Sequence, residues 1–148
     1  MNHAAPCRVM YSCPAEKTPM TDASGLIVTD FLQSLPHGTE CLDRYLSEDV
    51  EYWNVPLEPL HGRAAAKAFL APFVNAPPGA LKRMQILHSA YSSNCVFNER
   101  IETWSAGDVS VDLPVMGIFE LRDKHIVSWR DYFDLATIKP VLDAITSR

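Results

Sequence analysis

Several features that mark common protein functions are missing from this chain of 148 residues. No apolar run approaches the roughly 20 residues that a membrane-spanning helix needs, and the first residues lack the apolar segment of a signal peptide. There is also no excess of Lys and Arg, since the net charge is -5, which argues against nucleic acid and anionic membranes as partners. We therefore expect a cytoplasmic protein with free thiols, which binds neither nucleic acid nor membrane.

Motifs for metals, cofactors and covalent catalysis are absent as well. The four cysteines, at positions 7, 13, 41 and 95, form no CxxC pair and show no zinc spacing. The patterns GxSxG, GxxxxGK and GxGxxG do not occur, which argues against a serine hydrolase, a P-loop and a dinucleotide site. We expect no metal and no cofactor.

What the chain does contain is the composition of one ordinary globular domain. Its 47% hydrophobic and 21% charged residues allow a core that needs neither disulfides nor metal. Residues 1–20 hold three prolines and show no sustained periodicity, so they are predicted to form a flexible extension. Residues 21–148 are predicted to form a single domain.

The order of predicted elements indicates an α+β fold. Helical spacing of Leu26, Ile27, Phe31 and Leu35 predicts a first helix that ends at Pro36. Further helices are expected over residues 39–46, 63–74 and 135–147, and strands over 50–55, 82–92, 95–104, 109–121 and 125–133. Short turns between the last four strands favour antiparallel hairpins, and residues 76–79 are expected to form a loop beside a pocket mouth. A curved sheet wrapped over the helices follows.

Two of these strands carry charged residues on faces that should be buried. Alternation places Asn98, Arg100, Glu102 and Trp104 on one face of their strand, and Asp131 in an otherwise apolar row with Val127, Trp129 and Phe133. A buried carboxylate needs a partner, and Arg100 is the obvious one if the strands are close. We predict an array of Asp131, Arg100 and Glu102, which is neutral when it holds one proton. It suits paired acid and base catalysis, although a structural ion pair between strands is the alternative.

A second polar group is predicted on the strand at 50–55. Tyr52 and Asn54 share a face there, and a phenol with an amide can orient a small molecule such as water. If this face looks into the same cavity as Asp131, the three groups can hold a water molecule and aim it. Alternatively, Tyr52 is a core aromatic residue and Asn54 prepares the turn before Pro56.

Four segments of the sequence resemble the limonene epoxide hydrolase family. They are Tyr-Trp-Asn-Val-Pro-Leu at 52–57, Glu-Arg-Ile-Glu at 99–102, Leu-Pro-Val-Met-Gly-Ile-Phe at 113–119 and Trp-Arg-Asp-Tyr-Phe-Asp-Leu at 129–135. The likeness runs from about residue 22 to residue 140. That family belongs to the wider superfamily of cone-shaped, cystatin-like α+β folds that includes nuclear transport factor 2, ketosteroid isomerase and the SnoaL-like cyclases. The resemblance implies the same cone-shaped, mixed or antiparallel sheet here.

The resemblance also implies a reaction, the hydration of a small apolar epoxide in one step without a covalent intermediate. Asp131 would take a proton from a water molecule held by Tyr52 and Asn54, Arg100 would bridge the carboxyl groups, and Glu102 would protonate the epoxide oxygen. The implied apolar rim comprises Trp104, Leu113, Val115, Phe133 and Ile138. A homodimer is also implied.

One position departs from the family pattern, because Glu102 stands where the family has Asp. The extra methylene moves the carboxyl group by roughly 1.3 Å, enough to affect proton delivery. If Glu102 is merely tolerated, Glu102→Asp should speed turnover, and if the pocket has adapted to Glu, it should slow it. Two other functions therefore stay open: an epoxide-opening cyclase or isomerase of the same fold, and a non-catalytic ligand-binding domain.

Overall fold

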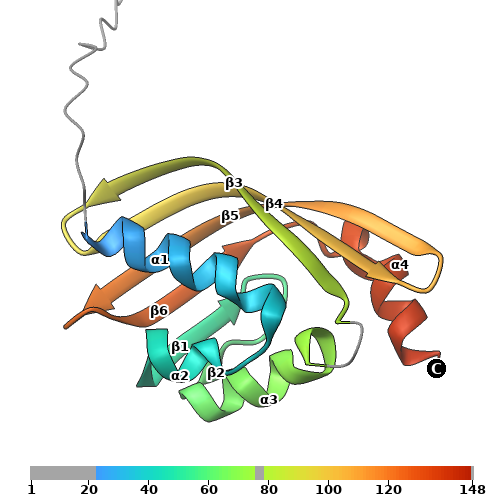
Figure 1. Cartoon of the computed structure of the whole chain (residues 1–148), viewed down its shortest axis with the longest axis horizontal. Coiled ribbons are helices and arrows are strands. Elements are labelled where there is room, and N and C mark those ends of the chain that lie inside the picture. The colour runs from blue at the N-terminus through green and yellow to red at the C-terminus, as the bar shows by residue number, and fades with distance from the viewer. Residues whose placement is uncertain (1–22, 76–78, 148) are drawn as a thin grey trace, which may run out of the picture.

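A single curved sheet forms the frame of the molecule in a computed structural model that describes residues 23–75 and 79–147 (Figure 1). Six strands pair in the order β2-β1-β6-β5-β4-β3. Their bounds are β1 Leu46–Asn54, β2 Leu60–His61, β3 Leu81–Ser92, β4 Cys95–Ala106, β5 Val109–Arg122 and β6 His125–Tyr132. The predicted extension at 1–20 and residues 76–78 of the predicted loop lie outside the described residues.

The sheet is mixed, with one parallel pair. Strands β3 to β6 form an antiparallel meander, as their short turns predict. Strand β1 pairs in parallel with β6 and antiparallel with the short strand β2. Because the chain crosses over between β1 and β6, polar residues from early and late in the sequence become neighbours in the middle of the sheet.

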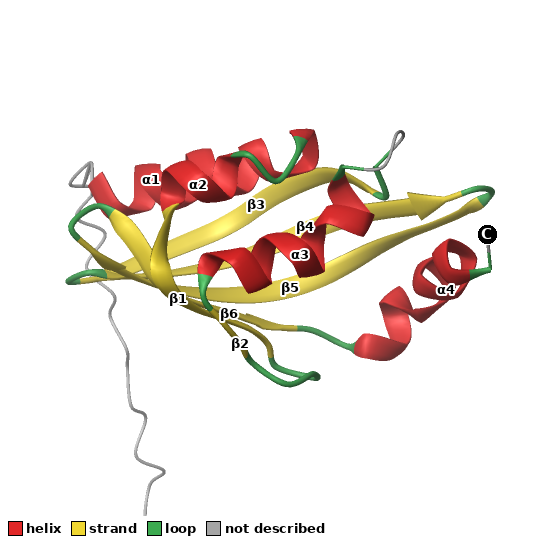
Figure 2. Ribbon diagram, turned by 90° about the horizontal axis from the view of Figure 1, so that it is seen from below, coloured by secondary structure: helices red, strands yellow, loops and turns green. Residues whose placement is uncertain are grey.

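Helices cover the inner face of this sheet. The helical elements are α1 Ala23–Ser34, the 3-10 turn η1 Leu35–His37, α2 Cys41–Tyr45, α3 Arg63–Val74 and α4 Leu135–Thr146. Helices α1, α2 and α3 lie along one side of the curved strands, and α4 packs near the far ends of β4 and β5 (Figure 2). The α+β fold class with a curved sheet over N-terminal helices is confirmed.

The main core lies between α1 and the sheet. Phe31 is fully buried, with its ring edge-on to Trp129 at a centroid distance of 5.0 Å. Trp129 in turn stacks against Tyr52 on β1 and Phe119 on β5. Such offset and edge-on aromatic contacts add to the free energy gained from burying the rings. They also fix the position of Tyr52.

Several local predictions were wrong in detail. Leu26 is one of the four apolar residues whose spacing predicted the first helix, but its side chain is 56% exposed. It precedes Phe31 by five residues, which places it about 140° away around the helix, so the buried stripe consists instead of Val28, Phe31, Leu32 and Leu35. The helix expected at 39–46 is only Cys41–Tyr45, and β1 begins at Leu46 rather than at residue 50.

Two prolines stand inside helices rather than at their ends. Pro72 lies in α3, which continues to Val74, and Pro140 lies in the middle of α4. Each proline removes one backbone hydrogen bond, and buried residues on either side of it, such as Ile138 and Val141 in α4, hold the helix in place. No helix in the described ranges is long and apolar enough to cross a bilayer.

The packing of α1 leads to a prediction on stability. Phe31→Ala should lower the free energy of unfolding by about 3–5 kcal/mol, because it opens a cavity beside Trp129. Leu26→Ala on the same helix is the matched control, and it should change the free energy of unfolding by no more than about 0.5 kcal/mol. Urea unfolding followed by tryptophan fluorescence measures both changes. Equal losses in the two variants would contradict this description of α1.

Candidate active site

A row of directly paired residues crosses four strands at the centre of the site. Asn98 on β4 pairs with Gly117 on β5, and Gly117 pairs with Asp131 on β6. Asp131 pairs on its other side with Asn54 of β1. Since residues that pair directly point to the same face of a sheet, the row brings three polar side chains onto the inner face. Gly117 has no side chain, so it leaves a gap in this row.

The gap at Gly117 lets a side chain from β4 reach β6. Arg100 lies one strand away from Asp131, with β5 between them, so its guanidinium has to pass over β5. A methyl group at residue 117 would collide with that guanidinium, and it would also come close to the ring of Phe119 and the amide of Asn98. Glycine is therefore required here for space.

Arg100 joins the two carboxyl groups through one nitrogen atom. Its Nη2 donates to Asp131 Oδ2 at 2.6 Å and lies 2.7 Å from Glu102 Oε1. Its Nε also donates to Glu102 Oε1 at 2.8 Å, and Nη1 donates to Asn98 Oδ1 at 3.2 Å. The exposed fractions are 0% for Arg100, 5% for Glu102 and 4% for Asp131, so the array is shielded from bulk solvent.

Burial and neighbouring charges set the ionisation of this array. Burial raises the pKa of Asp131 above its ordinary value of 3.8; the Arg100 cation lowers it and the negative charge of Glu102 raises it again, with a net upward shift. For Arg100, burial opposes the charge, but the two carboxylates outweigh it and raise its pKa further. Arg100 stays charged, while Asp131 holds a proton to higher pH than an exposed aspartate does.

Tyr52 and Asn54 form a bonded pair beside Asp131. The Asn54 amide nitrogen donates to the Tyr52 hydroxyl oxygen at 2.8 Å. Burial and the charge of Asp131 raise the pKa of Tyr52 well above 10.0, so its hydroxyl keeps its proton at neutral pH. The phenol O–H thus stays available as a donor, and the amide oxygen of Asn54 as an acceptor.

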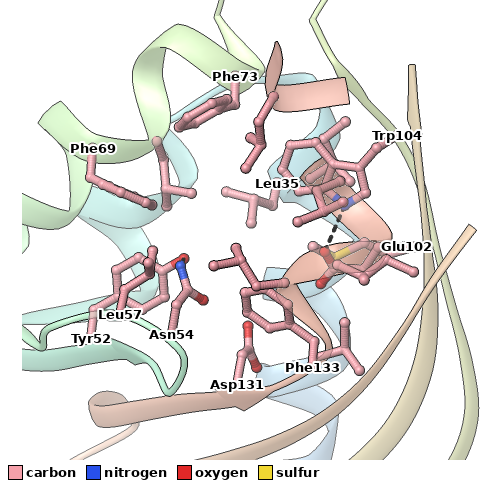
Figure 3. Close-up of a pocket in the computed structure, with 18 of the residues that line it drawn as sticks. Leu35, Tyr52, Asn54, Leu57, Phe69, Phe73, Glu102, Trp104, Asp131 and Phe133 are labelled. Atoms are coloured by element: carbon pink, nitrogen blue, oxygen red, sulfur yellow. Dashed lines mark hydrogen bonds between the residues drawn. The ribbon is translucent and has the colours of Figure 1, made fainter. Parts of the chain in front are cut away.

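One oxygen of Asp131 is left over by these contacts. Asp131 Oδ2 accepts from Arg100, whereas Oδ1 is buried and makes no hydrogen bond of normal geometry among the described residues. The indole of Trp129, whose Nε1 is also buried without such a bond, lies near this carboxyl group and favours its ionised form. Tyr52, Asn54 and Asp131 point into one cavity, and Glu102 and Trp104 lie on its other side (Figure 3). A buried acceptor without a partner is costly, so Oδ1 is suited to receive a hydrogen bond from a small polar molecule.

The rest of the cavity wall is apolar. Including its mouth, the cavity has about 640 Å³ of space between atoms. All five rim residues named from the family resemblance line it, namely Trp104, Leu113, Val115, Phe133 and Ile138. Tyr52, Asn54, Glu102 and Asp131 line it too, whereas Arg100 is buried behind the carboxyl groups.

Several wall residues were not singled out from the sequence. Phe69 and Phe73 of α3 and Leu35 of η1 close the side opposite Asp131 (Figure 3). Met84 of β3, which pairs with Glu102, lines the cavity as well. Phe69 and Phe73 are four residues apart on a helix, a spacing that is equally typical of core residues. The hydrogen bond from Arg100 to Asn98 and the need for glycine at position 117 were missed too. The one signal for Asn98 was its place on the same strand face as Arg100, and the one signal for Gly117 was its place in an otherwise apolar row.

The described residues contain no group of side chains that could bind a metal ion together. Among residues 23–75 and 79–147, no three His, Cys, Asp or Glu side chains lie where they could hold a metal ion together. The carboxyl groups of Asp131 and Glu102 instead face a guanidinium, which occupies the place between them.

Comparisons with known proteins agree with this architecture. The family model described as limonene-1,2-epoxide hydrolase catalytic domain matches residues 23–143. A solved structure of an LEH-like epoxide hydrolase from M. tuberculosis is 26% identical, with a TM-score of 0.68 over 84% of this chain and 92% of that one. Bal32a, from a soil-derived mobile gene cassette, is 18% identical, with a TM-score of 0.69 over 80% and 95% of the two chains.

A more distant likeness extends the fold beyond epoxide hydrolases. A SnoaL-like protein from Jannaschia sp. CCS1 is 16% identical, with a TM-score of 0.69 over 87% of this chain and 97% of that one. At this identity the similarity concerns the fold alone. The cone-shaped architecture is therefore shared by proteins with different names, and any function has to be argued from the side chains of the cavity.

The space above Gly117 gives a prediction on the array. Gly117→Ala should lower the free energy of unfolding by about 1–3 kcal/mol, because the added methyl group forces Arg100 away from Asp131. Met116→Ala is the control on the same strand, where the side chain is exposed, and it should cost no more than about 0.5 kcal/mol. Urea unfolding measures both, and a Gly117→Ala protein as stable as the parent would contradict the proposed need for this gap.

Proposed function

The chain belongs to the limonene-1,2-epoxide hydrolase family, and from this premise we propose that it adds water to small apolar epoxides. The product is a vicinal diol, formed in one step without a covalent enzyme intermediate. Asp131 is the proposed base, Glu102 the proposed acid, and Tyr52 with Asn54 the pair that holds the water.

One observation carries this proposal: two buried carboxyl groups meet at a single guanidinium nitrogen, Nη2 of Arg100. When one of the two is protonated, the array has no net charge. During the reaction Asp131 gains a proton and Glu102 loses one, so the net charge of the buried array stays the same. Such a transfer avoids the large cost of creating a new charge in a dry cavity.

The groups around Asp131 Oδ1 complement a water molecule. In the proposed complex the water donates one hydrogen to Asp131 Oδ1 and the other to the amide oxygen of Asn54. It accepts a hydrogen bond from the Tyr52 hydroxyl, which leaves one lone pair for the epoxide carbon. Holding the nucleophile in this way lowers the entropic cost of the attack.

Proton delivery to the epoxide completes the reaction. As the water oxygen bonds to the carbon, the ring C–O bond breaks, and its oxygen takes the proton of Glu102. Asp131 Oδ1 takes the proton of the water, so the atoms balance and the product is the diol. Both transfers are needed near neutral pH, because water is a weak nucleophile and an alkoxide a poor leaving group.

The apolar cavity wall supports an apolar substrate. The polar pair of Tyr52 and Asn54 favours hydrolysis over a cyclase or isomerase reaction. Apart from Tyr52, Asn54, Asp131 and Glu102, its lining is made of aliphatic, thioether and aromatic side chains. A cyclase would use a hydroxyl group of its own substrate and would have no use for a water held by Tyr52 and Asn54.

The first prediction for this function concerns the source of the added oxygen. Incubation with cyclohexene oxide, limonene oxide and styrene oxide in ¹⁸O-water should give diols that carry one labelled oxygen, measured by mass spectrometry. Asp131→Asn should lower kcat by about 100-fold or more while the circular dichroism spectrum is retained, because the amide cannot accept the proton.

A matched variant separates the loss of the base from a general loss of charge. Asp112→Asn changes an exposed carboxylate on β5, bonded to Thr103, and should leave kcat unchanged. Unlabelled product, or an Asp131→Asn protein with near-parental kcat, would contradict the proposed role of Asp131.

The second prediction concerns pH. The base has to be ionised in order to accept a proton, so kcat/KM should fall as the pH falls through the pKa of Asp131 in the free protein. Because burial and Glu102 raise that pKa, the midpoint of this acidic limb should lie above 3.8. Initial rates across a pH series give the midpoint, and a limb centred at or below 3.8 would refute the expectation.

A further inference from the structure

Trp104 makes a direct contact with the proposed acid. Trp104 and Glu102 share the inner face of β4, two residues apart, and the indole Nε1 donates to Glu102 Oε2 at 2.9 Å (Figure 3). The ring of Phe73 on α3 lies edge-on to the indole, with centroids 6.2 Å apart. The indole is therefore held from the helix side while its N–H reaches the carboxyl group.

The contacts of Glu102 leave little room for a proton. A carboxylate offers about four acceptor positions, two on each oxygen. Oε1 accepts from Nε of Arg100 and lies 2.7 Å from Nη2, so the cation covers that oxygen. Oε2 accepts from Trp104, which leaves a single acceptor position on Oε2, the oxygen away from Arg100.

We propose that Trp104 is a positioning residue for proton transfer, which restricts the proton of Glu102 to this one position on Oε2 and holds it toward the cavity. The inference rests on the proposed function, because it concerns the group that protonates the epoxide oxygen. An indole N–H can donate but cannot accept. Trp104 thus orients the carboxyl group without competing for its proton, which leaves the epoxide as the acceptor.

The same contact accounts for the length of the acid. An aspartate at position 102 would hold its carboxyl group about 1.3 Å nearer to the backbone of β4, away from the indole N–H. Glu102 and Trp104 therefore act as a matched pair. Of the two outcomes that the sequence leaves open for Glu102→Asp, slower turnover is the one that this geometry favours.

A simpler role for Trp104 is that of an apolar wall, since the indole also lines the cavity. Trp104→Phe separates the two roles, because phenylalanine keeps an aromatic wall and lacks the N–H group. A wall residue affects KM and substrate range. A positioning residue affects kcat.

The test begins with the kinetics of Trp104→Phe on the best epoxide of the panel. We expect kcat to fall about tenfold, as for the loss of one hydrogen bond to a charged group, with little change in KM. Trp53→Phe is the control: its indole donates to the carbonyl of Leu57, outside the array, and kcat should stay the same.

A double-mutant cycle tests whether the two residues act as a pair. In a Glu102→Asp protein the indole has already lost its partner, so adding Trp104→Phe should lower kcat by much less than tenfold. Additive losses would overturn the proposal. A Trp104→Phe protein whose KM rises while kcat keeps its parental value would overturn it too, because that is the result expected of a wall residue.

A spectroscopic arm separates this inference from the proposed function. In ¹⁵N-tryptophan-labelled protein, the indole N–H signal missing from Trp104→Phe identifies Trp104. In Glu102→Asp that signal should shift upfield as its bond is lost, while the signal of Trp53 stays. A parent protein that hydrolyses no epoxide refutes the proposed function, whereas a Trp104 signal that does not respond to Glu102→Asp refutes the hydrogen bond itself.

Discussion

The contact of one buried guanidinium with two buried carboxyl groups is the interaction on which the site depends. Removing three such groups from water costs several kcal/mol for each ion, and only close, well-aligned bonds offset that cost. Arg100 meets both Asp131 and Glu102 with distances of 2.6 to 2.8 Å, and Asn98 accepts from its remaining nitrogen. The surrounding sheet therefore has to hold β4, β5 and β6 in one register, because a slip of one residue would turn each group to the opposite face.

The burial that makes this array costly also gives it a use. In a medium of low polarity each charge acts strongly on its neighbours, and a proton on one of the two carboxyl groups makes the buried array neutral. An array open to solvent would ionise fully and have no proton to give at neutral pH. In the proposed reaction, the apolar wall of Phe69, Phe73 and Leu113 therefore bears on proton transfer as well as on the fit of a substrate.

Alternation along single strands was enough to predict which residues share a face, because the period of two holds locally. It placed Arg100 with Glu102 and Trp104, and the apolar row around Asp131 indicated a buried acid in need of a partner. What alternation cannot give is which strands are neighbours. Arg100 reaches Asp131 across a third strand, which works only because Gly117 has no side chain there, and the wall residues of α3 follow the same helical spacing as any core residue. Likewise, Leu26 was counted among the apolar residues of its helix and is nevertheless exposed, because an apolar residue near the start of a helix does not reveal the direction of the buried stripe.

The exchange of aspartate for glutamate shows why a departure from a family pattern has to be judged with its surroundings. Taken alone, an added methylene displaces an acid and argues for lost activity. Taken with Trp104, the same methylene carries Oε2 to an indole N–H, while Oε1 keeps its bond to Arg100. Two donors on opposite oxygens hold a longer side chain that would otherwise have more rotamers to explore. The length of the side chain at position 102 and the identity of the residue at position 104 are therefore linked by geometry. A substitution at either position changes the effect of a substitution at the other.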